Sequence, residues 1–272
     1  MDALVLLRLQ VEWGADEALE DAPVNRLRPP VLAPAPDAPA AAAHPPAPTW
    51  PASTPTAPAL PGPAPAARVT PAQQALSAAS RATSLDELRA AIAAFDGCAL
   101  RDTAANLVFA TGDPATGLLL VGDPPGEAED RGGAAFSGTD GALLDQMLGS
   151  IGLTRHDLVL TPMIPWRPPG GRPPNAGEIT VCLPFLHRLI ALAAPRRVVL
   201  CGALAVRTLL GPTRRRGAPA WVDMPVPGMP APVPALPLPS PATMARTPTA
   251  RREAWAALRL LRRAIDADLA KI

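Results

Sequence analysis

The chain has no tyrosine, a single lysine and three cysteines, and aromatic residues make up only 3% of its 272 residues. So few cysteines exclude a disulfide framework and favour a reducing compartment, for which we expect the cytoplasm. A formal net charge of +1 excludes a polycation that holds nucleic acid through its total charge. No apolar run approaches the ~18 residues of a membrane span, so we expect no membrane partner. We expect the chain to be a monomer.

Two appendages are expected before a domain that spans residues 72–272. We expect no export signal in residues 1–28, because Arg8 interrupts their apolar run and no small-residue cleavage site follows. They instead predict a short amphipathic helix that either docks on the domain or binds a protein partner. Residues 29–71 contain fifteen prolines among alanines and are predicted to form a disordered, semi-stiff linker.

The stretch of residues 118–148 organises the domain. Its apolar start, residues 118–121, predicts a buried parallel strand. A turn and an acidic, glycine-rich loop follow as far as Gly138, and apolar residues at helical spacing then predict a helix. Ligands of an open parallel sheet sit beyond the carboxyl ends of the strands, so this loop is a candidate site. The alternative is an ordinary strand-to-helix turn.

Other elements follow from local signals. Strands are predicted over residues 158–164 and 197–200. Helices are predicted over residues 85–95 and after Asn175, because each start carries a capping box, in which a side-chain oxygen and a glutamate satisfy free backbone amides.

The C-terminal part is expected to hold one more strand and one more helix. Nine prolines lie between Pro219 and Pro241. Proline removes backbone donors, so this fourth strand is expected to be short, at an edge or partly melted. A helix from about Thr247 is expected to turn Trp255, Leu258, Leu261 and Ile265 inward, with its arginines on a solvated face.

The order of short motifs resembles that of the family 4 uracil-DNA glycosylases. The matching segments are Gly122-Asp123-Pro124-Pro125-Gly126, Glu129-Asp130, Ala135-Phe136-Ser137-Gly138, Trp166-Arg167-Pro168-Pro169 and Cys182-Leu183-Pro184-Phe185-Leu186. The resemblance covers nearly all of residues 72–272. It implies an α/β fold, a three-layer α/β/α sandwich with a short parallel sheet.

The resemblance implies roles for the residues of the first motif. Gly122 and Gly126 match substrate-binding positions, and Asp123 matches a catalytic glutamate that handles the attacking water or the sugar charge. Phe136 matches the ring on which an extruded base stacks. The alternatives are that Asp123 caps the following turn and that Phe136 is a plain core aromatic.

Two further active-site positions depart from the family. Pro162 stands where the family has an asparagine that binds the uracil edge, and proline offers no donor there. Ser240 stands in place of a catalytic histidine that hydrogen-bonds the leaving base, and losing one well-placed donor costs about 10²–10³ in rate. Met244 matches an apolar wedge that fills the gap left by the extruded base.

The expected partner is DNA that contains a damaged or deaminated base. Arg167, Arg172 and Arg246 are candidate phosphate contacts, because phosphate binding needs only positive charge near the groove. The run Arg214–Arg216 is interpreted as part of a solvated loop, and the alternative is that it contacts DNA.

The resemblance also bears on metal binding. The family holds an iron–sulfur cluster by four cysteines, of which only Cys98 and Cys182 are present, whereas Arg101 and Trp166 stand at the other two positions. Such clusters need about four thiolates, so we expect no cofactor. Cys201 is expected to be a core thiol. Trp166 is expected to stack on Arg101 in the vacated space.

Two hypotheses of function therefore stand. The first is an enzyme of base-excision DNA repair that hydrolyses the N-glycosidic bond of uracil or another deaminated base, with weakened or shifted activity. The second is a catalytically inactive module of the same fold that binds DNA or a repair partner. A Rossmann-type nucleotide binder is disfavoured, because no Gly-x-Gly-x-x-Gly follows the first strand.

Overall fold

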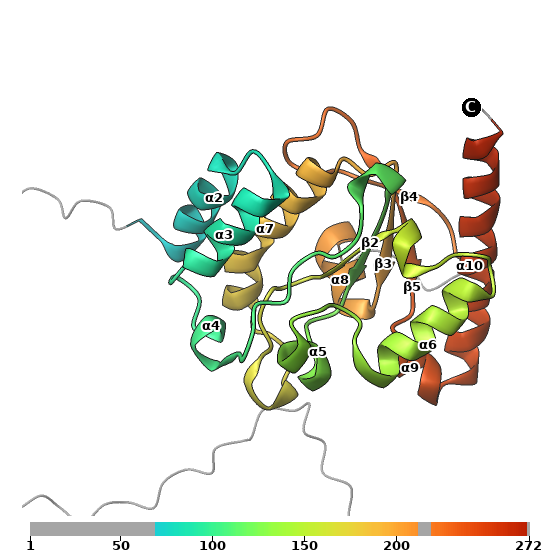
Figure 1. Cartoon of the computed structure of the whole chain (residues 1–272), viewed down its shortest axis with the longest axis horizontal. Coiled ribbons are helices and arrows are strands. Elements are labelled where there is room, and N and C mark those ends of the chain that lie inside the picture. The colour runs from blue at the N-terminus through green and yellow to red at the C-terminus, as the bar shows by residue number, and fades with distance from the viewer. Residues whose placement is uncertain (1–68, 212–218, 271–272) are drawn as a thin grey trace, which may run out of the picture. The chain divides into compact units, whose positions relative to one another are not determined.

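The structure is a computed structural model that describes residues 69–211 and 219–270 (Figure 1). The helix expected in residues 1–28, nearly all of the linker and the run Arg214–Arg216 lie outside the described residues. The helices are α2 (Pro71–Arg81), α3 (Leu85–Ala94), α4 (Leu100–Thr103), α5 (Glu127–Gly132), α6 (Gly138–Gly149), α7 (Ala176–Ala193), α8 (Ala203–Leu210), α9 (Pro241–Arg246) and α10 (Pro248–Leu269), with 3₁₀ turns at Pro114–Thr116, Arg155–Asp157 and Pro169–Gly171. The strands are β1 (Leu118–Gly122), β2 (Val159–Pro162), β3 (Arg197–Cys201), β4 (Val222–Met224) and β5 (Val233–Leu238).

The sheet has the order β2-β1-β3-β5-β4. The first four strands in this order run parallel, and β4 is an antiparallel edge strand that the sequence did not predict. β1 lies in the middle and is buried along its whole length, as expected for a parallel strand covered on both faces. The expected α/β class is therefore confirmed.

The fourth predicted strand corresponds to β5, and the expectation that it is short or at an edge is wrong. β5 has six residues and lies between β3 and β4. Its two prolines are tolerated because each has a neighbouring strand on one side only. Pro234 is paired with Asp223 of β4, and the pairing of β5 with β3 begins only at the next residue. Pro237 is paired with Leu200 of β3 and lies beyond the last residue of β5 that pairs with β4.

Two hydrophobic cores cover the two faces of the sheet. Leu119 and Val121 of β1 belong to the core that includes residues of α2, α3, α7 and α8. Leu118 and Leu120 alternate to the other face, whose core includes residues of α6, α9 and α10. Figure 1 shows the sheet between these two groups of helices, which is the expected three-layer arrangement.

Local capping explains most helix starts. Thr70 and Gln73 form a capping box at the start of α2, a helix that was not predicted, and Asn175 and Glu178 form the predicted box of α7. Ser84 accepts a hydrogen bond from the amide of Glu87, as predicted. The loop expected down to Gly138 contains the short helix α5.

Helix α7 is the one helix in the described part of the chain that is long and apolar enough, by length and composition, to cross a membrane. Its side chains Phe185, Leu189 and Ile190 are buried in the core, and the helix packs against α2 and α3. Burial of each such side chain contributes about 1.5–3 kcal/mol. The guanidinium of Arg188 donates to the carbonyl of Ala82 on the same side. The apolar character of α7 is therefore explained by its packing in the core of the domain.

The orientation predicted for Trp255 on α10 is wrong. The buried positions of the helix are Ala250, Ala254, Ala257, Leu258 and Leu261. These follow the helical spacing of one face, and Trp255 lies outside it, about 100° around the helix from Ala254 and about 60° from Leu258. The Trp255 residue is 44% exposed.

Candidate functional site

The carboxyl ends of four strands meet at one edge of the sheet. Gly122 at the end of β1 is paired with Pro162 of β2 on one side and with Cys201 of β3 on the other. Cys201 is in turn paired with Leu238 of β5. The residues that follow these strands, including Asp123 and Ser240, therefore share this edge, where parallel sheets bind ligands.

Phe136 is held directly over the end of β1. A Cβ atom added to Gly122 would lie 2.3 Å from the tip of the Phe136 ring, so this contact requires glycine at position 122. Phe136 has a φ of 56°, a left-handed conformation that a bulky residue adopts only when its surroundings impose it.

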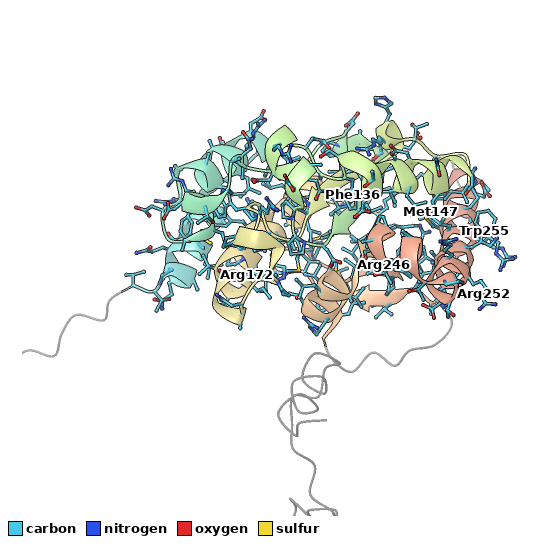
Figure 2. The ribbon with its side chains drawn as sticks, turned by 90° about the horizontal axis from the view of Figure 1, so that it is seen from below. Phe136, Met147, Arg172, Arg246, Arg252 and Trp255 are labelled. Carbon is cyan, nitrogen blue, oxygen red and sulfur yellow. The ribbon has the colours of Figure 1, made fainter. Side chains whose placement is uncertain are left out.

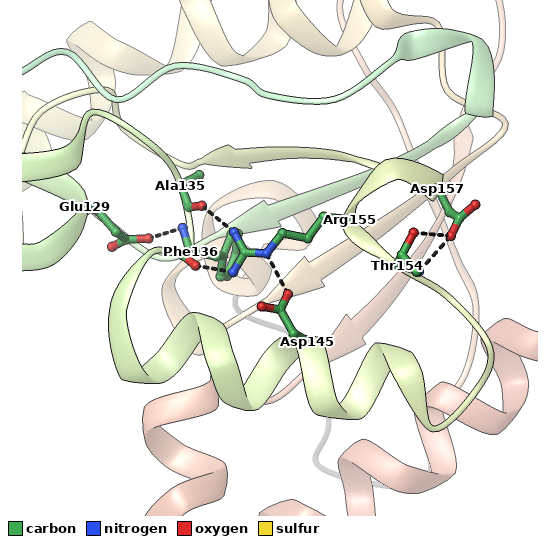
Figure 3. A network of polar contacts seen from close by, with 7 residues as sticks. All are labelled: Glu129, Ala135, Phe136, Asp145, Thr154, Arg155 and Asp157. Atoms are coloured by element: carbon green, nitrogen blue, oxygen red, sulfur yellow. Dashed lines mark hydrogen bonds and ion pairs between the residues drawn. The ribbon is translucent and has the colours of Figure 1, made fainter.

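The surroundings of Phe136 supply that constraint through two charged side chains (Figure 3). The Glu129 carboxylate accepts a hydrogen bond from the amide of Phe136 and another, at 2.6 Å, from the amide of Gly126. On the other side, the Arg155 guanidinium donates to the carbonyl of Phe136 at 2.5 Å. Asp145 accepts from Nε of Arg155 at 2.6 Å and fixes its orientation.

The sequence analysis assigned no role to Glu129 or Arg155. Glu129 lies in the first motif, three residues after Gly126, at the spacing of a capping box, and that spacing is a local signal. Its burial raises its pKa, which the two backbone hydrogen bonds partly oppose. Arg155 had no signal, because its contact with Phe136 spans 19 residues of sequence.

Asp123 lies at the start of α8. Its carboxylate Oδ1 accepts a hydrogen bond from the amide of Ala205 at 3.4 Å. A Cβ atom added to Gly202 would lie 2.1–2.3 Å from the atoms of this carboxyl group. Asp123 thus supplies the capping oxygen that Gly202 lacks. Asp123 therefore does act as a cap, which was the alternative considered for it, but it caps the helix that follows β3 and not the turn that follows β1.

The surroundings of Asp123 raise the pKa of its carboxyl group. Burial raises the pKa of its carboxyl group, while the amides of Ala205 and Leu204 and the charge of Arg207 lower it in part. Burial is the largest of these causes and the net direction is upward. A carboxyl group with a raised pKa at a strand end is a recurrent feature of functional sites.

Ser240 lies at the same edge but is occupied as a helix cap. Its Oγ accepts from the amide of Thr243 at the start of α9 and lies 2.9 Å from the Thr243 hydroxyl. Both residues line a hollow of about 470 Å³, which Gly202 also lines. We call this the Ser240 hollow; Gly202 lies between it and the carboxyl group of Asp123, which does not itself line the hollow. Pro162 is buried and lends the edge no side-chain donor.

The residues predicted to contact DNA differ in their availability. Arg246 is exposed at the end of α9, and Arg167 is half-buried with a buried Nε that has no hydrogen-bond partner among the described residues. Arg172 is exposed and forms an ion pair with Glu178. Figure 2 shows the positions of Arg172, Phe136 and Arg246 when the molecule is seen from below. Met244 is completely buried in the core, so in this structure it does not project as a wedge.

The donor set at the family's cluster position consists of two thiols. Cys98 and Cys182 are both buried, and a hydrogen bond with Cys182 lowers the pKa of Cys98 to about 7. The same bond and burial raise the pKa of Cys182. Cys201 belongs to the core on the opposite face of the sheet. Two thiols do not fit a cluster that needs four thiolates.

The two other cluster positions also lack ligands. Trp166 is buried, whereas Arg101 is exposed and donates to the carbonyl of Phe95 at 3.1 Å. The expected stacking of Trp166 on Arg101 is wrong. Among the described residues, the one cation–π contact joins Arg197 and Trp221.

The fold and the site define an α/β protein whose candidate ligand site lies at the carboxyl edge of a mainly parallel sheet. Residues 109–259, more than half of the chain, match the model of the uracil DNA glycosylase superfamily. The chain therefore belongs to the uracil-DNA glycosylase superfamily.

Curated relatives agree with this assignment. The chain is 35% identical over 132 residues to the type-4 uracil-DNA glycosylase of Pyrobaculum aerophilum, covering 48% of this chain and 67% of the relative. It is 37% identical over 120 residues to that of Sulfurisphaera tokodaii and 36% identical over 124 residues to that of Archaeoglobus fulgidus. These two matches cover 44% and 46% of this chain, and 54% and 62% of the relatives.

Proposed function

We propose that the protein hydrolyses the N-glycosidic bond of uracil or another deaminated base in DNA, with weakened or shifted activity. The observation that carries this proposal is the Phe136 ring, held over Gly122, the residue that directly precedes Asp123. The superfamily assignment and the names of the relatives support a damaged base in DNA as the substrate.

Each residue has a defined task in this proposal. Phe136 offers its face for stacking of the extruded base, a contact worth about 1–3 kcal/mol per base. Asp123, in its ionised form, orients the attacking water or stabilises positive charge on the sugar. The Ser240 hollow, at about 470 Å³, falls within the size range of small-ligand pockets and lies next to Asp123 through Gly202.

Single-turnover excision from oligonucleotides that contain uracil, hypoxanthine or xanthine tests the proposal. We expect slow excision of at least one base, a loss of at least 10²-fold in Asp123→Asn and of about tenfold in Phe136→Leu. Asp113→Asn is the matched control. The Asp113 carboxylate also accepts a hydrogen bond from a backbone amide, that of Ala115, but it lies at the opposite edge of the sheet. Excision by Asp123→Asn at a rate close to that of the parent protein would contradict the proposal.

A non-catalytic module that binds DNA or a repair partner is the second candidate. It is supported by Pro162, which lacks donors, and by Ser240, whose hydroxyl caps α9. The parent protein would then excise no base from any of the three substrates, yet would still bind duplex DNA with an abasic site.

We also propose that the protein carries no iron–sulfur cluster, because Cys98 and Cys182 are the two ligands left. Purified protein is expected to be colourless, with iron and sulfide far below one equivalent. Brown protein with iron that remains in Cys98→Ala would show that other residues hold a metal group.

A further inference from the structure

The exposed face of α10 carries an alternation of arginine and tryptophan. Arg252, Trp255, Arg259 and Arg263 are all exposed, and we call these four residues the α10 stripe. Their spacing of three, four and four residues places them on one side of the helix over about 16 Å. Every other aromatic side chain in the described part of the chain is buried or half-buried.

The three arginines of the stripe keep their charge and donors available. No hydrogen bond or ion pair of Arg252, Arg259 or Arg263 is found among the described residues. The other two arginines of α10 are engaged: Arg251 donates to the carbonyls of Met244 and Ala245, and Arg262 pairs with Asp266.

The acidic residues of α10 do not neutralise the stripe. Asp266 is paired with Arg262 and Asp268 with Arg197, while Glu253 faces the Ser240 hollow. Arg259 and Arg263 are four residues apart on the helix, where like charges repel each other. A negatively charged partner would relieve that repulsion.

The geometry points to a nucleic-acid strand as this partner: we infer that the α10 stripe binds single-stranded DNA, with the arginines on phosphates and Trp255 stacked on a base. Guanidinium groups match phosphate geometry, and an exposed indole offers a face on which any base stacks. A membrane surface is a poorer fit, because the broad apolar face of α10 is already buried in the core.

The stripe starts in the first turns of α10, near the carboxyl edge of the sheet where the candidate site lies. α9 ends at Arg246 and α10 begins two residues later, at the carboxyl edge of the sheet. In the view of Figure 2, Arg252 and Trp255 lie at the outer margin of the molecule, and Arg246 lies between them and Phe136. The inference rests on the proposed function only in that both take DNA as the partner.

The test uses the full chain and a fluorescent twenty-nucleotide thymidine strand without uracil, with binding measured by anisotropy at several salt concentrations. We expect Arg259→Gln/Arg263→Gln to weaken binding about tenfold and to flatten the slope of log K against log salt by about 1.4, or 0.7 per lost phosphate contact. Trp255→Leu keeps an apolar side chain and is expected to weaken binding about tenfold through lost stacking.

The matched control is Arg81→Gln/Arg89→Gln, which removes the same charge from exposed helical positions of α2 and α3. It is expected to bind within twofold of the parent. Equal losses in both double variants would overturn the inference, because net charge alone would then explain binding. No binding by the parent, or stripe-dependent binding of phosphatidylserine vesicles without binding of the strand, would also overturn it.

Excision separates this inference from the proposed function. Uracil excision from a five-nucleotide substrate, which is too short to span both sites, is expected to be unchanged in Arg259→Gln/Arg263→Gln. A parent that excises nothing but binds the thymidine strand through the stripe would refute the proposed function alone.

Discussion

The two sides of the candidate site are built in different ways. At the end of β1, Phe136 is fixed in a left-handed conformation by Glu129 and Arg155, and their hydrogen bonds converge on its backbone. At the end of β5, Ser240 makes only the local contacts of a helix cap. The comparison shows that the Phe136 side is a preorganised element, whereas the Ser240 side has a hydroxyl committed to local structure.

The largest expected effect comes from rebuilding the weaker side. Pro162→Asn/Ser240→His introduces side-chain donors at both departing positions and is expected to raise uracil excision at least 10²-fold in single-turnover assays. Each single change is expected to raise excision by less than half of the double variant's gain on a logarithmic scale, because both donors act on one bound base. Pro162→Ala/Ser240→Ala is the control. A folded double variant without any gain would show that the two sides do not form one pocket.

Breaking the stronger side is expected to cost stability as well as activity. Glu129→Ala leaves the amides of Phe136 and Gly126 without their acceptor and is expected to lower the free energy of unfolding by about 2–3 kcal/mol in urea titrations. The neighbouring Glu127→Ala removes an exposed ion pair with Arg131 and is expected to cost less than about 0.5 kcal/mol. Equal costs would mean that Phe136 is held by packing alone.

The pH dependence of excision distinguishes the two half-buried carboxyl groups on the Phe136 side, Asp123 and Glu129. The proposed function needs ionised Asp123, whose pKa is raised by burial, so excision is expected to fall about tenfold per pH unit below that raised value and to level off above it. The acid limb is thus expected at higher pH than an ordinary aspartate gives. An identical limb in the residual activity of Asp123→Asn would assign it to another group, such as Glu129.

The smallest effect is expected from the Ser240 cap. Ser240→Ala removes the oxygen that accepts from the amide of Thr243 and is expected to lower the free energy of unfolding by about 1 kcal/mol. Ser240→Thr retains a hydroxyl and serves as the matched variant. A change in excision without a change in stability would show that Ser240 contacts the substrate.

Local sequence was sufficient for the elements whose signals lie within a few residues. The capping box of Asn175 with Glu178 and the apolar run of β1 both predicted what the structure contains, because caps and strand hydrophobicity depend on near neighbours. The order of the motifs likewise sufficed to identify the family, which the superfamily match confirms.

Tertiary structure decided the rest. The contact of Asp123 with α8 joins residues 82 apart, and the clamp on Phe136 joins residues 19 apart. The position of β5 inside the sheet depends on where its neighbours begin and end, which the prolines by themselves do not reveal. The exposure of Trp255 follows from which side of α10 meets the sheet. Each depends on pairing between distant segments, whereas composition and periodicity report only on the segment itself.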